Sequence, residues 1–97
     1  MDYKLIWSPQ AIEDIAAIAE YIARDSTIYA ESTVEQIFQA PARLTHFPKL
    51  GRVVPEKNDE SIREIFVFQY RIIYEIVASE IHVLTVVHGK RIIEELI

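Results

Sequence analysis

Residues 62–91 decide the fold, and they read IREIFVFQYRIIYEIVASEIHVLTVVHGKR. Aliphatic and aromatic side chains dominate three runs of strand length, at residues 62–67, 69–77 and 81–88. Runs separated by such short connections pair most simply as antiparallel hairpins. Ala78 and Ser79 form the expected turn between the last two strands. The final third of the chain therefore predicts an antiparallel sheet.

Both faces of this predicted sheet carry large apolar side chains. In the strand at residues 69–77, Ile72 and Tyr74 point to one face, whereas Ile73 and Val77 point to the other. Two helices can cover only one face, and an exposed apolar patch usually marks a binding surface. We therefore expect a protein partner to cover the second face. The alternative is that the loop at residues 51–61 and the C-terminal tail cover it.

Four basic or titratable side chains interrupt these apolar strands. They are Arg63, Arg71, His88 and Arg91. A buried arginine is costly unless it has a partner, so the four could converge as an anion site on one side of the sheet. The structural alternative pairs Arg71 with a glutamate at position 56, 64 or 75, pairs Arg63 with Glu64 on an edge, and lets His88 cap the last strand.

The N-terminal half predicts one strand and two helices. Tyr3 to Trp7 is strand-like, and Ser8 followed by Pro9 is typical of a helix start. An apolar face recurs at helical spacing up to residue 22, with Glu13 and Asp14 expected on a solvated face. A second helix is expected from residue 29 to 45, with a kink or break at Pro41. Together with a turn at residues 47–52, where Gly51 provides a permissive backbone, the order is β-α-α-β-β-β.

Length and composition limit the class of protein. The 97 residues predict a single domain, spanning residues 1–97, of the α+β class, in which a helical hairpin packs on one face of a small twisted antiparallel sheet. The net charge of −5 does not favour a nucleic-acid binder. There is no cysteine, and the histidines lack ligand spacing, so we expect no metal and no cofactor. We read no signal peptide and no membrane span, and we expect a cytoplasmic protein.

The order of short motifs resembles the ParE/RelE toxin superfamily, which includes plasmid-stabilisation proteins. The resemblance covers nearly the whole chain. It rests on Trp7-Ser8-Pro9, Phe47-Pro48, Gly51-Arg52, Ile62-Arg63-Glu64, Tyr70-Arg71-Ile72-Ile73-Tyr74 and Val87-His88-Gly89-Lys90-Arg91. It implies the toxin of a bacterial type II toxin–antitoxin pair, with a cognate antitoxin as partner in a hetero-oligomer. ParE-like members inhibit growth by poisoning DNA gyrase, and RelE-like members cleave messenger RNA on the ribosome.

The resemblance also implies roles for individual residues if the protein is a metal-independent nuclease. Arg71, Arg91 and Arg63 would hold the phosphate, His88 would perform acid–base chemistry, and Glu56 would be a base. The chain departs from the RelE pattern at two positions, where Ile65 replaces a lysine and Ile97 replaces a tyrosine. We therefore favour the gyrase-directed reading over the ribosomal one. A third reading is an inactive toxin fold that only binds its antitoxin.

Overall fold

The computed structural model describes residues 2–91, and it confirms the α+β class and the order of the main elements. The first half contains strand β1 (Lys4–Trp7), helix α1 (Pro9–Ala23) and helix α2 (Thr27–Gln39). Two 3-10 turns, η1 (Ala40–Thr45) and η2 (Pro48–Leu50), precede the short strand β2 (Arg52–Val53). The last third contains β3 (Ile62–Val67), β4 (Tyr70–Val77) and β5 (Glu80–His88). The predicted C-terminal tail beyond residue 91 lies outside the described residues.

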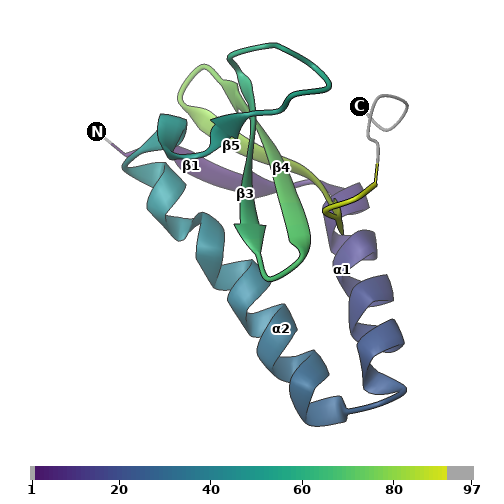
Figure 1. Cartoon of the computed structure of the whole chain (residues 1–97). Coiled ribbons are helices and arrows are strands. Elements are labelled where there is room, and N and C mark those ends of the chain that lie inside the picture. The colour runs from purple at the N-terminus through teal and green to yellow at the C-terminus, as the bar shows by residue number, and fades with distance from the viewer. Residues whose placement is uncertain (1, 92–97) are drawn as a thin grey trace.

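The five strands form one sheet in the order β1-β5-β4-β3-β2. Strands β3, β4 and β5 are antiparallel neighbours, as the sequence predicts. Strand β1, however, lies parallel to β5, with Lys4 opposite Glu80 and Trp7 opposite Val83. The sheet is therefore mixed and not wholly antiparallel. Parallel strands need a long crossover, and here the chain passes through both helices and three further strands before β5 returns beside β1 (Figure 1).

Helix α1 begins where the sequence predicts, whereas α2 begins at Thr27, earlier than the predicted residue 29. The hydroxyl of Ser8 accepts a hydrogen bond from the Ala11 amide, and Pro9 occupies the first turn of α1. Helix α2 ends at Gln39, and the chain continues as a 3-10 turn through Pro41, which confirms the expected break. Among residues 2–91, no helix has both the length and the apolar character that a bilayer span requires.

The main core lies between the helical hairpin and one face of the sheet. Ile15 of α1 and Ile37 of α2 pack there with Ile72 of β4 and Val83 of β5, and all four side chains are buried. The two helices diverge from their connecting turn, and the ends that this turn joins extend beyond the β3–β4 hairpin (Figure 1). The part of the helical hairpin nearest its connecting turn therefore has no sheet beneath it.

The second face of the sheet is closed at its centre by the chain itself. Val54, in the segment that follows β2, packs on Ile73 and Val87, and all three are buried. The expectation that a partner covers this face is therefore wrong for the centre of the face. There the alternative is confirmed, because the loop at residues 51–61 covers it. Apolar exposure persists nearer the β3–β4 turn, where Phe66 and Phe68 are each about half exposed.

Candidate functional site

A buried cluster of charged side chains lies on the second face of the sheet and is centred on Arg71. The β3–β4 register places Arg71 opposite Phe66. Because side chains alternate along a strand, Glu64 lies on the same face as Arg71. Its Oε1 accepts from the Arg71 Nε at 2.6 Å. Glu56, in the loop before β3, adds its carboxylate from the other side.

Every nitrogen of the Arg71 guanidinium has an acceptor. Nη1 donates to Glu56 at 2.8 Å and to the Arg91 carbonyl at 3.0 Å. Nη2 donates to Glu56 at 2.8 Å and lies 2.6 Å from Glu64. The Arg71 side chain is only 4% exposed. The hydrogen bonds that Arg71 donates to Glu56, and then to Glu64, raise the pKa of Arg71 above its ordinary value, although burial opposes the shift. Arg71 is thus a permanent cation whose three guanidinium nitrogens are all engaged.

The cluster is electrically balanced. Glu64 is fully buried, and its second oxygen receives the Nε of Arg52 at 2.5 Å. The two carboxylates of Glu56 and Glu64 therefore face the two guanidinium groups of Arg52 and Arg71. Of the three glutamates considered as partners for Arg71, positions 56 and 64 are confirmed, and no contact to position 75 is found among the described residues. A neutral cluster offers little attraction to a phosphate group.

Arg63 lies on the opposite face of the sheet from Arg71. It directly precedes Glu64 in β3, so its side chain points the other way. Its Nε donates to the Glu60 carbonyl at 2.8 Å, and its Nη1 donates to the Gly51 carbonyl at 2.9 Å. The expected pairing of Arg63 with Glu64 is therefore wrong, because Arg63 instead binds the backbone of the turn that leads into β2.

The same turn is held by a buried tyrosine. The Tyr74 hydroxyl accepts from the Gly51 amide at 3.0 Å and donates to the Pro48 carbonyl at 2.7 Å. Burial raises the pKa of Tyr74 above its ordinary value. Gly51 has an ordinary negative φ, so the backbone conformation does not require glycine. Glycine fits here because there is no room for a side chain. A Cβ there would lie 2.5 Å from the Glu64 carbonyl oxygen.

His88 and Arg91 line a separate pocket on the helix side of the sheet. The pocket has a volume of about 340 Å³, and Asp14, Tyr21 and Tyr70 are among its other lining residues. The His88 ring meets Tyr70 edge-on at 6.2 Å, and its Nδ1 accepts from the Lys90 amide. Burial is the main reason that the pKa of Tyr70 is raised. This pocket combines an imidazole, a guanidinium and two phenols with the carboxylate of Asp14.

The five candidate residues therefore do not form one cluster. Glu56 and Arg71 pair directly, and the Arg91 backbone joins them. Arg63 and His88 lie elsewhere, because each belongs to the other face of the sheet. Convergence was inferred from position along the strands, and the alternation of side chains separates residues 63 and 88 from residue 71.

Asp14 is a structural residue that the sequence reading assigned to solvent. Its Oδ2 accepts from the Thr85 hydroxyl and from the Val86 amide at 3.0 Å. These groups lie beside the irregularity where β5 carries one extra residue against β4. Asp14 thereby fixes α1 onto β5. The signal was available, since Asp14 is four residues before Ile18 and thus borders the apolar face of α1.

Comparison with known proteins places this arrangement in a family. Residues 5–93 match the model of the ParE toxin of type II toxin-antitoxin system, parDE. The chain belongs to this family. It is therefore a type II toxin of the ParE/RelE group, as the order of motifs indicates.

Individual relatives of this toxin carry both names. Toxin RelE2 of Caulobacter vibrioides is 26% identical over 90 residues, which cover 92% of this chain and 98% of that protein. A chain from the chromosomal ParDE TA system of P. aeruginosa superposes with a TM-score of 0.75 at 19% identity, covering 91% of this chain and 97% of that one. A mutant of E. coli toxin RelE in the free state gives 0.66 at 16% identity, covering 93% and 86%. At such identities the structures show a shared fold.

Proposed function

We propose that this toxin acts on DNA gyrase, in the manner of ParE-like proteins, and that a cognate antitoxin neutralises it. The observation that carries the proposal is the state of Arg71. A nuclease of the RelE type would use this arginine to hold the scissile phosphate, but all three of its guanidinium nitrogens already donate to protein acceptors. Phosphate binding would require the Glu56 carboxylate to leave a buried cation.

The core supports the same choice. Ile65 stands where the RelE pattern has a second lysine. It is partly buried against the main core and supplies no positive charge to the site. Ile97, which replaces the expected tyrosine, lies outside the described residues. A transition state with a negatively charged phosphorane needs several cationic or donor groups, and the described part of the site supplies few that are unengaged.

Charge also favours a target other than the ribosome. The protein has a net charge of −5. Nucleic-acid binders gain affinity by neutralising phosphates, and a like-charged protein is repelled at long range. An acidic toxin is better suited to a protein surface.

Ribosome-dependent cleavage of mRNA is the second candidate, and the pocket beside β5 favours it. His88 and Arg91 line that pocket together with Tyr70. In this candidate mechanism His88 performs acid–base chemistry, and Glu56 acts as a base after its carboxylate has left Arg71. Arg91 and Arg71, once Arg71 is freed from Glu56, bind the phosphate. Arg63 remains a peripheral cation. A third candidate is a protein that only binds its antitoxin and arrests nothing.

One set of assays separates the three candidates. The chain is expressed without antitoxin to score growth, and purified protein is added to gyrase supercoiling reactions and to translation reactions whose mRNA ends are mapped. We expect growth arrest, inhibited supercoiling or trapped cleaved DNA, and intact mRNA. Codon-phased cuts that disappear in Arg91→Ala and His88→Ala would favour the nuclease. Normal growth with retained antitoxin binding would favour the inactive module.

A further inference from the structure

The tip of the β3–β4 hairpin carries an aromatic surface that the rest of the fold leaves exposed. Phe66 and Phe68 are each about half exposed. The hairpin tip lies beside α2 (Figure 1), from which Tyr29 places its half-exposed ring 6.3 Å from that of Phe68. A groove of about 380 Å³ is lined by both phenylalanines and by Arg43 of η1. We call Tyr29, Phe66 and Phe68, together with the neighbouring Arg43 and Arg52, the aromatic patch.

The backbone at Phe68 is strained. Strand β3 ends at Val67 and β4 begins at Tyr70, so Phe68 and Gln69 form a two-residue hairpin loop. Phe68 has a φ of 54°, a left-handed value that is costly for a bulky side chain. Two-residue hairpin loops usually have glycine, asparagine or aspartate where φ is positive. The turn therefore favours a small or polar residue at position 68 and gives no reason for a phenyl ring.

Packing within the protein does not account for Phe68 either. Its ring meets that of Tyr29 at a tilt, and both rings keep about half of their surface in solvent. Strain and apolar exposure therefore coincide in one side chain. Backbone strain of this kind is concentrated at functional sites, and a few aromatic anchors supply most of the binding energy of a protein interface. Both observations indicate that the Phe68 ring serves in binding.

The charges beside these rings are positive. The guanidinium carbon of Arg52 lies 5.4 Å from the centre of the Phe66 ring, and the Arg52 side chain is largely exposed although it also binds Glu64. Arg43 is exposed, and within residues 2–91 no hydrogen bond or salt bridge is found for its side chain. The whole protein has a net charge of −5. The aromatic patch thus differs in sign from the molecule as a whole and attracts acidic groups.

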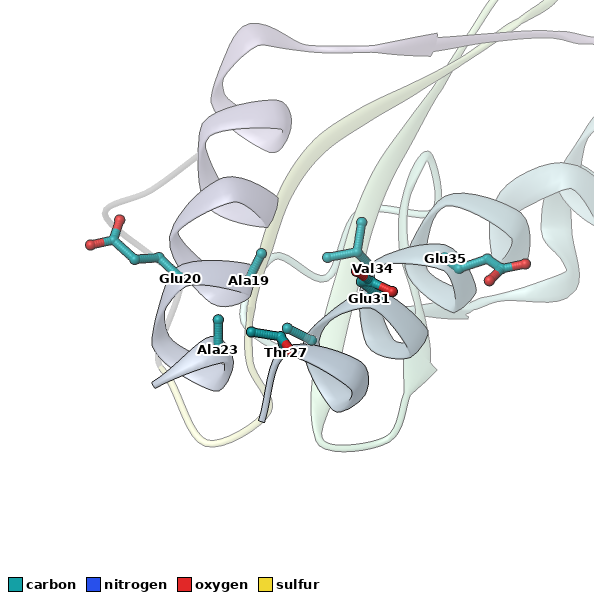
Figure 2. A pocket seen from close by; sticks show the side chains of 8 residues that line it. Ala19, Glu20, Ala23, Thr27, Glu31, Val34 and Glu35 are labelled. Atoms are coloured by element: carbon teal, nitrogen blue, oxygen red, sulfur yellow. The ribbon is translucent and has the colours of Figure 1, made fainter. Parts of the chain in front are cut away.

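The groove between α1 and α2 has a different character. Figure 2 shows Ala19, Ala23 and Val34 beside it, with the carboxylates of Glu31 and Glu35 on α2. Small side chains and negative charges border that groove, whereas rings and guanidinium groups make up the aromatic patch. Aromatic residues and arginine are the types enriched at the centres of protein interfaces. The aromatic patch is therefore suited to a separate protein contact.

We propose that the aromatic patch is the surface through which this toxin contacts its target protein, with Phe68 as the central anchor. The inference rests on the proposed action on DNA gyrase. The Phe68 ring enters an apolar pocket of gyrase, and carboxylates around that pocket meet Arg43 and Arg52. Bases also stack on exposed rings, but a net charge of −5 repels nucleic acid at long range. Binding of DNA in the absence of gyrase is therefore a contrary outcome of the test.

The test measures binding and inhibition of gyrase by the intact chain. Supercoiling assays give the toxin concentration that halves gyrase activity, and biolayer interferometry on immobilised gyrase gives Kd. In Phe68→Asn, relief of the backbone strain offsets the lost contact with Tyr29, so the melting temperature should stay within about 4 °C of the wild-type value. We expect this variant to bind and inhibit gyrase about tenfold more weakly or worse. Phe68→Tyr keeps the ring and should recover most of this loss.

Matched variants separate the aromatic patch from general effects of charge and exposed rings. Arg43→Glu reverses a charge of the patch, and Lys49→Glu makes the same change at an exposed lysine of η2. Phe47→Asn removes an exposed ring outside the patch. We expect Arg43→Glu to weaken gyrase binding by about threefold or more, and the other two variants to remain near wild type. Arg43→Glu decides the outcome if Phe68→Asn melts at a lower temperature than expected.

The assays distinguish two kinds of failure. Wild-type protein that neither binds nor inhibits gyrase would overturn the proposed action on gyrase, and this inference with it. Full inhibition of gyrase by Phe68→Asn and Arg43→Glu would overturn the inference alone. The same holds for an equal loss in Phe47→Asn, and for DNA binding without gyrase that Phe68→Asn abolishes.

Discussion

Replacing Arg71 with alanine is expected to cost this domain a large part of its stability. The guanidinium is buried between Glu56 and Glu64, and Glu64 has no exposed side-chain surface. Removing one partner of a buried ion pair leaves an uncompensated charge and costs about 3–5 kcal/mol. A domain of this size has a free energy of unfolding of about 5–15 kcal/mol. The melting temperature should therefore fall by about 12 °C or more.

Urea unfolding followed by circular dichroism measures this change, and two variants act as references. Glu56→Gln keeps the Glu64 pair, and the Glu56 side chain is 18% exposed, so we expect a smaller loss of about 1–2 kcal/mol. Arg91 meets Arg71 through its backbone carbonyl alone, so Arg91→Ala should change stability by no more than about 0.5 kcal/mol. A loss below about 1 kcal/mol in Arg71→Ala would refute the reasoning.

This outcome affects how activity data are interpreted. If Arg71→Ala abolishes growth arrest, the loss can follow from unfolding and not from missing chemistry. Arg91→Ala and His88→Ala change exposed side chains, so they test the nuclease hypothesis without that ambiguity. Growth assays on position 71 therefore need a parallel measurement of folded protein.

Three further predictions concern the scaffold. Tyr74→Phe leaves the buried Gly51 amide and the partly buried Pro48 carbonyl without this partner and should cost about 2–3 kcal/mol. Tyr70→Phe should cost less, because no hydrogen bond is found for the Tyr70 hydroxyl among the described residues. Burial raises the pKa of Tyr74 above its ordinary 10.0, so its protonated form is favoured in the folded state. The resulting contribution to the free energy of unfolding is present below pH 10 and is lost as the pH rises further. In urea titrations at a series of pH values, the free energy of unfolding should decline less steeply in Tyr74→Phe than in the wild-type protein. Asp14→Ala should cost about 2 kcal/mol because the hydroxyl and amide that it accepts from lose their partner, with Glu13→Ala near zero; equal losses would contradict the assigned role. Ala78→Gly should stabilise by about 1 kcal/mol because Ala78 is exposed with a φ of 55°, and a lower melting temperature would contradict this.

The regular elements were largely predictable because their signals are local. The Ser8-Pro9 start, the break at Pro41 and the three C-terminal strands each depend on residues within one element or turn. The position of β1 was not predictable in this way. Its four residues pair with β5 after a separation of most of the chain, and no local pattern reports the direction of such a partner.

The candidate site was predictable in its pairs but not in its geometry. Position 64 lies on the same strand face as Arg71 across one hairpin, so alternation alone suggests that contact. Glu56 comes from an irregular loop whose path no periodicity describes. The position of Val54 on the second face was not predictable for the same reason. Val54 follows β2, and a strand of two residues gives no sequence pattern from which its place in the sheet could be predicted.

The parallel pairing of β1 with β5 also has a consequence during synthesis. Trp7 and Leu5 are apolar and belong to β1, the first strand of the sheet along the chain, yet their neighbours Val83 and Ile81 belong to β5, the last strand of the sheet. A contact between such distant segments closes a very long loop and forms late. The nascent chain therefore has no complete sheet until β5 has been synthesised. A chain that terminates before β5 therefore leaves β1 without its neighbour in the sheet.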